Sequence, residues 1–477
     1  MKILLTGVTG YIGKRLLIQL LEEGHHVVCS VRDKNRFGLK LFKEKIDQIE
    51  VIENDFLDDK TLDTIPKDIE AAYYLIHSMS SSDGDFKEKE KLSAENFKKA
   101  LEKTQAKQVV FLTGIINEKK LSKHLESRKN VEEALESSVY ALTSLRAGII
   151  VGSGSASFEI IRDLAEKLPL MVAPKWVNTK CQPIAIRNVM QFLVGVLGKE
   201  FTYKQQYDIA GTDVLTYKEM LLTYAKIRGL KRSIYIVPLM TPKFSSYWLY
   251  FVTSTSYFLA KNLVDSMKID VVASKNDLAE RLGIQLFSYK EAITLAFDKI
   301  KQNDVLSSWY DSFSNNFHTR QVWQYLEVPD EGCYKDIREL KIEDEKATLD
   351  RIFSIGGKTG WYYADFLWRI RGFLDKLFGG VGLRRGRRNM TDLDAGDSVD
   401  FWRVLYADKE KGRLLLFAEM KLPGEAWLEF KVKNGVLRQE ATFRPLGISG
   451  RLYWYSVLPF HGLIFNGMLK KLVGKKS

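Results

Sequence analysis

The 477-residue chain has few of the residues that build disulfide frameworks and metal sites. Its three cysteines, Cys29, Cys181 and Cys333, lie far apart, and only two of its six histidines, His25 and His26, are neighbours. These spacings argue against a disulfide framework and against a cysteine zinc site, and we predict no metal centre. Free cysteines fit a reducing compartment, so we predict a cytoplasmic protein.

Long apolar runs are also missing. The best candidate for a membrane span, Ile236–Val264, contains two lysines and two prolines among many serines and threonines. It therefore offers no clean stretch of about 20 apolar residues. Glycines interrupt the apolar start of the chain and no small-residue cleavage site follows, which argues against a signal peptide. The composition, 45% hydrophobic and 28% charged, is that of a globular protein, and the length suits two or three domains.

Positive charge is in excess, with a net charge of +12 and a pI near 9.2. Such a balance permits contact with anionic lipid, nucleic acid or phosphorylated ligands. The basic residues are spread along the chain without a nucleic-acid-binding motif, so we predict no nucleic-acid partner. Arginines flank Gly386, and the apolar Met468–Val473 carries lysines, so peripheral contact with the inner membrane face is one expectation. A packed helix with a solvated tail is the favoured alternative, and nothing indicates an oligomeric state.

The first half of the chain alternates between strand and helix patterns. Amphipathic segments such as Arg15–Glu23 and Ala94–Lys103 separate short runs rich in β-branched residues. This alternation predicts βαβ units and a doubly wound parallel sheet of the α/β class. The predicted strands are Lys2–Thr6, Val27–Val31, Ala71–Ile76, Val109–Thr113 and Ala141–Ala147.

The C-terminal part has a different pattern, which predicts an α+β domain. Glu343–Arg351 and Trp361–Phe378 are expected to be helices, and Tyr453–Val473 a long closing helix. Asn434-Gly435 is a two-residue hairpin signal between strands. The predicted antiparallel meander comprises Val399–Tyr406, Arg413–Leu422, Ala426–Lys433 and Val436–Phe443. We therefore divide the chain into residues 1–300, a linker over 301–335, and a second domain over 336–477.

A glycine-rich motif follows the first predicted strand and precedes a helix. In Thr6–Gly13, glycines recur at positions 7, 10 and 13. Gly7 is expected to make a tight turn, Gly10 to let backbone approach a pyrophosphate, and Gly13 to permit close packing. Backbone N–H groups at the helix start would face the phosphates. The predicted cofactor contacts here are Thr6, Gly7, Thr9, Gly10, Tyr11, Ile12 and Gly13.

The end of the second predicted strand favours NADP(H) over NAD(H). Sites that prefer NAD(H) place a carboxylate there for the ribose 2′-hydroxyl. This chain has Ser30 and then Arg32, whose guanidinium suits a 2′-phosphate, although Asp33 follows. Asp55 is placed either to bond the adenine amino group or to serve as a plain turn aspartate.

These residues resemble the extended and atypical branch of the short-chain dehydrogenase/reductase family, whose members include NmrA-like and epimerase-like proteins. The resemblance covers roughly residues 1–300 and implies NAD(P) binding. Residues after 336 resemble a second domain found in bacterial members, similar to the helix-grip (SRPBCC-like) folds that hold apolar ligands. The features that carry the resemblance of the first part are Thr6–Gly13, Asn54–Asp58, Ala71–Ser78, Val109–Gly114 and Leu145–Gly152.

The chain departs from this family at its Tyr-x-x-x-Lys pair. The resemblance places His124 at the tyrosine position, Arg128 at the lysine position and Thr113 near the usual serine. His124 could act as the general acid while Arg128 holds ribose hydroxyls, or His77 could move the proton. Alternatively, these are binding or surface residues without a catalytic role.

The resemblance implies a function of one of two kinds. The first is an NADP(H)-dependent oxidoreductase acting on a small hydrophobic carbonyl- or quinone-like molecule. The second, motivated by the missing tyrosine and lysine, is a dinucleotide-binding sensor or assembly protein without turnover. On the substrate side we expect Trp176, Asn178 and Gln182 either to contact substrate or to pack loops, and Tyr247–Phe258 to line an apolar cleft or a core.

Overall fold

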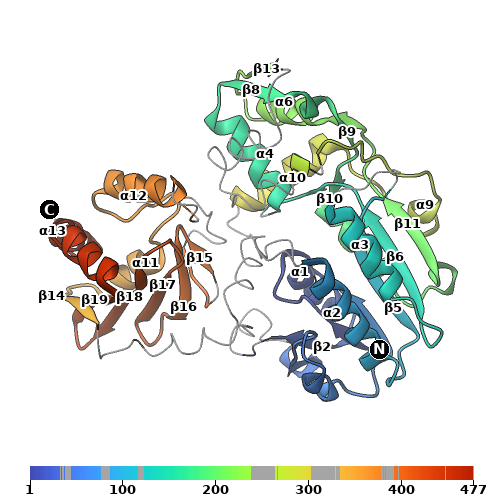
Figure 1. The fold of residues 1–477 in the computed structure, drawn as a ribbon, viewed down its shortest axis with the longest axis horizontal. Coiled ribbons are helices and arrows are strands. Elements are labelled where there is room, and N and C mark those ends of the chain that lie inside the picture. Colours follow the sequence, from blue (N-terminus) through green and yellow to red (C-terminus); the bar gives the residue numbers. More distant parts are fainter. Residues whose placement is uncertain are drawn as a thin grey trace. The chain divides into compact units, whose positions relative to one another are not determined.

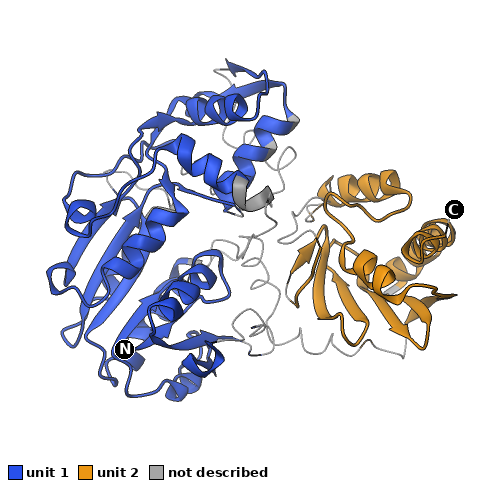
Figure 2. Ribbon diagram, turned by 180° about the vertical axis from the view of Figure 1, so that it is seen from behind, with its two compact units in different colours: residues 1–312 blue, residues 313–477 orange. Residues whose placement is uncertain are grey.

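The computed structural model forms two compact units, Met1–Ser312 and Phe313–Ser477, which are described separately (Figure 2). The structure describes residues 1–32, 34, 37, 45–76, 86–116, 123–153, 155–237, 264–265, 267–301, 328, 333–377, 380, 382, 391–395, 397–445 and 447–475.

A seven-stranded parallel sheet forms the centre of the first unit (Figure 1). Its order is β11-β6-β5-β4-β1-β2-β3, so the order reverses between β1 and β4. Open sheets of this kind bind ligands beyond the carboxyl ends of the strands at such a switch point. The predicted doubly wound α/β fold is confirmed. The strands are β1 (Lys2–Leu5), β2 (His26–Val31), β3 (Ile49–Glu53), β4 (Ala71–Tyr74), β5 (Gln108–Gly114), β6 (Ala141–Ala147) and β11 (Gln205–Ile209).

Helices cover both faces of this sheet. On one face α1 (Tyr11–Glu22) and α5 (Ile186–Gly195) bury their leucines and valines against alternate residues of β1, β2 and β6. On the other face α2 (Phe86–Leu101) and α3 (Lys123–Ala134) pack against the opposite side chains of the same strands. Strands that are buried on both faces read as continuous apolar runs, which is why the sequence pattern predicted β1, β2, β4, β5 and β6. The edge strands β3 and β11 were not predicted, because they are partly exposed and carry polar residues.

A smaller layer extends the first unit beyond β6. Its aromatic core includes Trp176, Phe158 and Tyr224. The short helix η4 (Lys175–Asn178) belongs to this core, whereas η3 (Asp59–Thr64) packs beside α2 and η5 (Glu200–Thr202) beside β11. The other elements of the layer are β7 (Ile150–Val151), α4 (Ala156–Lys167), β8 (Leu170–Pro174), β9 (Lys180–Cys181), β10 (Ile184–Ala185), β12 (Leu215–Thr216), α6 (Tyr217–Ile227), β13 (Ser233–Val237) and α10 (Tyr289–Lys301). Helix α9 (Leu278–Arg281) packs instead into the core beside α1 and α5.

In its described residues, the second unit is a six-stranded antiparallel sheet with three helices, as the α+β prediction expected. The strand order is β14-β19-β18-β17-β16-β15, so the first strand pairs with the last. The long helix α13 packs beside β14 and β19. Its elements are β14 (Tyr334–Lys341), α11 (Glu345–Phe353), α12 (Asp365–Leu377), β15 (Ser398–Val399), β16 (Trp402–Asp408), β17 (Arg413–Ala418), β18 (Gly424–Lys433), β19 (Val436–Pro445) and α13 (Gly447–Leu472).

The structure differs from the sequence prediction at three places in this unit. Strand β14 was not predicted, because it carries polar residues on both faces and pairs with β19 about a hundred residues away. The predicted strand Val399–Tyr406 is split at Asp400, which has a left-handed φ of 52°. Helix α13 begins at Gly447 rather than Tyr453 and runs through Pro459. The Asn434-Gly435 hairpin is confirmed, with φ values of 52° and 72° as a type I′ turn requires.

Within the described residues, no helix is both long and apolar enough to cross a membrane.

Candidate functional site

The glycine motif forms a tight turn between β1 and α1 at the switch point of the sheet. Gly7 adopts a left-handed φ of 67°, and a Cβ atom there would lie 2.6 Å from the carbonyl oxygen of Leu75. A Cβ at Gly13 would lie 2.3 Å from the carbonyl oxygen of Gly7. Both positions therefore require glycine, and Gly13 packs against the loop itself rather than against the sheet.

The amino-terminal end of α1 is not capped by the side chain of its N-cap residue. Gly10 is the N-cap residue and provides no side-chain hydrogen bond, and the first turn contains no acidic residue. The first N–H groups of a helix lack partners within the helix and carry partial positive charge. An uncapped helix start beside a glycine turn is thus suited to a phosphate.

Thr6 and Ser30 hold strand ends together on either side of this turn. The buried Thr6 hydroxyl donates to the carbonyl oxygen of Tyr73 over 3.0 Å and accepts from the N–H of Leu75 over 3.1 Å. The buried Ser30 hydroxyl donates to Asn54 over 2.6 Å. In this structure both predicted contact residues therefore use their hydroxyls on the protein.

Arg32 lies directly after β2, with 31% of its side chain exposed. Its Nε atom is 3.9 Å from Oδ1 of Asp55, and that same oxygen accepts a turn hydrogen bond from the N–H of Leu57 over 3.1 Å. Asp55 therefore has the geometry of a turn aspartate, which was one of the two alternatives for it. Because β1 and β2 are parallel neighbours, Arg32 and the glycine turn leave the sheet at the same edge.

Tyr11 and Arg15 connect the glycine turn to the segment after β7. The Arg15 guanidinium stacks on the Tyr11 ring at 4.0 Å and donates to the carbonyl oxygens of Tyr11 and Ser153, each over 3.0 Å. Burial raises the pKa of Tyr11 to about 12, so the phenol stays neutral at physiological pH. Sequence reasoning missed Arg15, which has no place in the glycine pattern. Thr9 and Ile12 are half-buried beside it.

Two of the four predicted catalytic side chains are described. Thr113 is buried near the end of β5, and Arg128 is buried in α3. His124 lies in the first turn of α3, one helical turn before Arg128, but its side chain is outside the described part of the structure. His77 also lies outside the described residues.

Arg128 of α3 contacts β5, α2 and the segment that follows β4. Its guanidinium donates to the carbonyl oxygens of Ile76 and Leu112 over 3.2 and 3.0 Å, and its Nε atom lies 3.4 Å from the Thr113 hydroxyl. Its Nη1 atom is 3.7 Å from the buried Glu90, a residue that sequence reasoning missed. This arrangement shapes the carboxyl edge of β4 and β5, where a nicotinamide ring would lie in a Rossmann site.

We expect Arg128→Met to destabilise the first unit by about 3–5 kcal/mol, because it leaves the Glu90 carboxylate buried without its cation. Urea unfolding with hydrogen exchange at the amides of β4 and β5 reports the stability of this sheet. Lys129→Ala, at an exposed neighbour, is the matched control and should leave protection unchanged. Equal stability of wild type and Arg128→Met would show that the ion pair does not hold these strand ends.

Two of the side chains predicted to contact substrate, Trp176 and Gln182, pack or hydrogen-bond within the protein. Trp176 is buried and packs edge-on against Tyr217, with ring centroids 6.0 Å apart. Gln182 donates to the carbonyl oxygen of Gly211 over 2.8 Å and accepts from the N–H of Ala273 over 3.0 Å. Asn178 is exposed. Tyr247–Phe258 lies outside the described residues.

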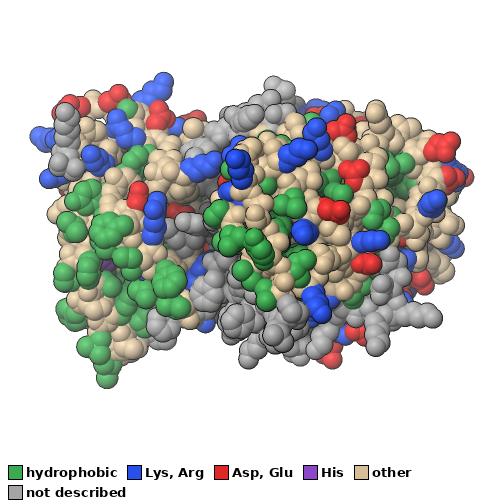
Figure 3. All heavy atoms as spheres, turned by 90° about the horizontal axis from the view of Figure 1, so that it is seen from above, with side chains coloured by type: hydrophobic (Ala, Val, Ile, Leu, Met, Phe, Trp, Pro, Cys, Tyr) green, Lys and Arg blue, Asp and Glu red, His purple; other side chains and the backbone are tan. Residues whose placement is uncertain are grey.

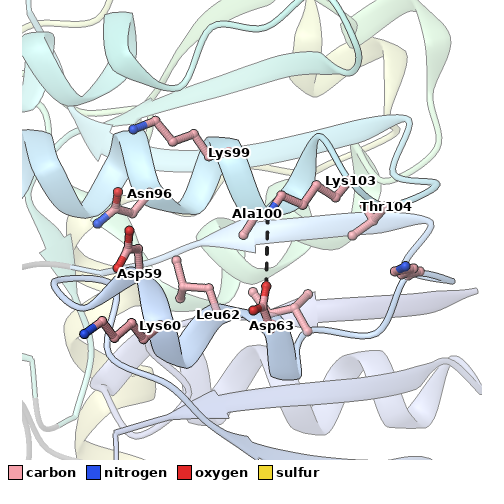
Figure 4. Close-up of a pocket in the computed structure, with 11 residues that line it drawn as sticks. Asp59, Lys60, Leu62, Asp63, Asn96, Lys99, Ala100, Lys103 and Thr104 are labelled. Atoms are coloured by element: carbon pink, nitrogen blue, oxygen red, sulfur yellow. Dashed lines mark ion pairs between the residues drawn. The ribbon is translucent and has the colours of Figure 1, made fainter.

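A groove of about 430 Å³ lies elsewhere, between η3 and α2 (Figure 4). Lysines dominate its rim, and Lys103 bridges it toward Asp63 over 4.0 Å. None of the predicted site residues lines it, so the groove is separate from the glycine turn. Its lining comprises Asp59, Lys60, Leu62, Asp63, Ile65, Lys67, Asn96, Lys99, Ala100, Lys103 and Thr104.

Among the residues that the structure describes, no group of three or more His, Cys, Asp or Glu side chains is placed to hold a metal ion.

Comparison with known proteins agrees with this geometry. Residues 7–163, which contain the glycine turn, match the family model described as NAD(P)H-binding. Residues 330–468 match a family described as "Protein of unknown function (DUF2867)". The first unit therefore has a Rossmann fold whose residues 7–163 are similar to NAD(P)H-binding proteins, whereas the helix-grip resemblance of the second unit stays a prediction.

Three individual proteins that resemble this chain share at most a quarter of their aligned residues with it. The divinyl chlorophyllide a 8-vinyl-reductase of Arabidopsis thaliana chloroplasts is 25% identical over 252 residues, which cover 50% of this chain and 60% of that protein. Among solved structures, the triphenylmethane reductase of Citrobacter sp. complexed with NADP(H) has 17% identity and a TM-score of 0.50, covering 62% of this chain and 100% of the other. The NADPH-dependent quinone oxidoreductase of Escherichia coli has 17% identity and a TM-score of 0.50, covering 62% and 99%. At these identities the structural matches establish the fold of the first unit.

Proposed function

We propose that the chain is a reductase that uses NADP(H) on a hydrophobic carbonyl- or quinone-like substrate. The observation that carries the proposal is the arrangement of Arg32 beside an uncapped α1 at one edge of the sheet. The guanidinium can pair with a 2′-phosphate, while the positive end of α1, which has no side-chain cap, suits the pyrophosphate. Similar proteins named as reductases, two of them in complexes with NADP(H) or NADPH, support the choice.

A 2′-phosphate would have to compete with the Asp55 carboxylate for the Arg32 guanidinium. This carboxylate lies 3.9 Å from Arg32, but it also accepts the N–H of Leu57 and so keeps a partner when Arg32 turns away. A partly exposed ion pair of this length contributes little stability, so the rearrangement costs little. Arg32 is consequently available to an incoming phosphate.

Reduction also needs a proton donor. A bound dihydronicotinamide supplies the hydride, and the protein must supply one proton to the substrate oxygen for the charges to balance. Segment 115–134 contains no tyrosine, and Tyr140 donates its hydroxyl proton to the carbonyl oxygen of Leu135 instead. His124, one turn before Arg128, is our candidate for the donor because imidazole titrates near physiological pH.

We expect the purified chain to oxidise NADPH in the presence of a hydrophobic quinone or carbonyl acceptor, and His124→Ala to lower kcat by about a hundredfold or more, as loss of a general acid does. NADPH absorbance over a panel of acceptors measures the rate. His26→Ala, at an exposed histidine, is the control and should keep full activity. Full activity of His124→Ala would rule out His124 as the donor.

The second candidate is a dinucleotide-binding sensor without turnover. It is favoured by the buried state of Arg128, whose guanidinium is occupied by four protein groups rather than open to a ribose. This function predicts NADPH binding with no oxidation by any acceptor in the panel. Turnover above the rate of free NADPH would exclude it.

A further inference from the structure

Two helices of the second unit present apolar side chains that its own core does not cover. Figure 3 shows hydrophobic side chains gathered on this unit. On α12 the exposed residues recur at helical spacing along one stripe, and on α13 they lie between Ile448 and Leu463. The residues concerned are Phe366, Ile370, Phe373, Leu374 and Leu377 on α12, and Ile448, Leu452, Tyr455, Leu458, Phe460 and Leu463 on α13. We call these eleven residues the apolar face.

The amount of exposure is unusual for side chains of this size. Ile448 is 78% exposed, Leu452 66% and Phe366 61%. Single exposed apolar residues are common, but a set of this size on neighbouring helices marks a surface that binds something apolar. The two helices touch: the guanidinium carbon of Arg371 in α12 lies over the ring of Tyr453 in α13, 5.9 Å from its centroid.

The exposed charged residues of the two helices that carry the apolar face are positive. Helix α13 contains no acidic residue. The acidic residues of α12 are turned to the protein: Asp365 accepts the N–H of Trp361 over 2.8 Å, and the buried Asp375 accepts the N–H groups of Lys421 and Gly382. Arg369 and Arg451, by contrast, are exposed.

The combination of exposed apolar side chains and exposed arginines indicates what kind of partner binds the apolar face. Aromatic and aliphatic side chains bordered by arginines suit the boundary between acyl chains and anionic headgroups. A second copy of the same face fits less well, because a two-fold interface would bring the arginines of both copies together without carboxylates to pair with them. We propose that the apolar face docks onto an anionic lipid membrane and lies in its surface.

The end of α13 does not take part in this docking. Met468, Leu469 and Leu472 belong to the core of the second unit and are at most 2% exposed. The apolar, lysine-bearing end that the sequence suggested as a membrane contact is therefore a packed helix end. The lipid-binding surface is instead formed by residues 448–463 of α13 together with α12. This proposal does not depend on the function of the dinucleotide site.

Vesicle sedimentation of the full chain tests the proposal. The vesicles are phosphatidylcholine alone, or phosphatidylcholine with phosphatidylglycerol, at low and at physiological salt. We expect binding to the anionic vesicles that weakens with salt. Phe366→Glu combined with Leu452→Glu should abolish it. Arg369→Ala and Arg451→Ala should each lower the partition coefficient about fivefold, as expected for one cation near a charged surface. Leu170→Glu, at a 56% exposed leucine of the first unit, should bind like wild type.

Sedimentation velocity without lipid completes the test. If wild type is a dimer and Phe366→Glu combined with Leu452→Glu makes it a monomer, while neither form binds vesicles, the face is a self-association surface and the proposal is overturned. It is also overturned if the double variant binds anionic vesicles as well as Leu170→Glu does. Unchanged circular dichroism shows that each variant is folded, which is expected because the substituted side chains are exposed.

Discussion

Gly13→Ala is expected to weaken NADPH binding by at least about a hundredfold, which corresponds to about 2.7 kcal/mol. The added Cβ would lie 2.3 Å from the carbonyl oxygen of Gly7 and 2.7 Å from Cα of Val8. Neither backbone atom can yield without opening the turn that carries the phosphate-facing N–H groups. One added methyl group therefore suffices to displace the backbone of the glycine turn.

Isothermal titration calorimetry with NADPH measures this loss. Gly462→Ala is the matched control, because a Cβ there meets no atom within 4 Å. It should bind NADPH like wild type and should remain folded. If Gly13→Ala keeps wild-type affinity, the turn between β1 and α1 does not hold the pyrophosphate.

Arg32→Ala is expected to lower the affinity for NADPH about tenfold, or about 1.4 kcal/mol, and to leave the affinity for NADH unchanged. The guanidinium would interact only with the additional 2′-phosphate, so its loss acts on one of the two cofactors. Asp55→Asn should have the opposite effect, because it frees Arg32 from its carboxylate partner and removes a negative charge near the phosphate.

Competition between the two cofactors in one titration series measures this selectivity. Arg228→Ala is the control, since it removes an arginine of the same unit that pairs with Glu166 at a distance from the sheet edge. An equal loss of NADPH and NADH affinity in Arg32→Ala would mean that Arg32 supports the fold of the site and does not select the phosphate.

Local patterns were sufficient to predict the parallel sheet and the glycine turn. Strands buried on both faces are apolar without interruption, and the three glycines follow β1 at a spacing set by the turn itself. The Asn434-Gly435 hairpin was predictable for the same reason, since two adjacent residues determine it. These features need no information from distant parts of the chain.

Features made by distant segments were not predictable. The environment of Arg128 combines Glu90 of α2 with carbonyl oxygens at the ends of β4 and β5, and only the folded sheet brings them together. Strand β14 depends on its pairing with β19 across the whole second unit. Sequence periodicity showed that α13 is apolar, but it did not show that Met468 is buried while Leu452 is exposed.

The central claim is that the edge of the sheet at Gly7–Gly13 and Arg32 binds NADP(H). The most direct test is a calorimetric titration of the wild-type chain with NADPH and, separately, with NADH. We predict one site per chain and an affinity for NADPH that is at least about tenfold higher than that for NADH, or about 1.4 kcal/mol. No heat of binding with either dinucleotide would contradict the account, because both the reductase and the sensor require an occupied site.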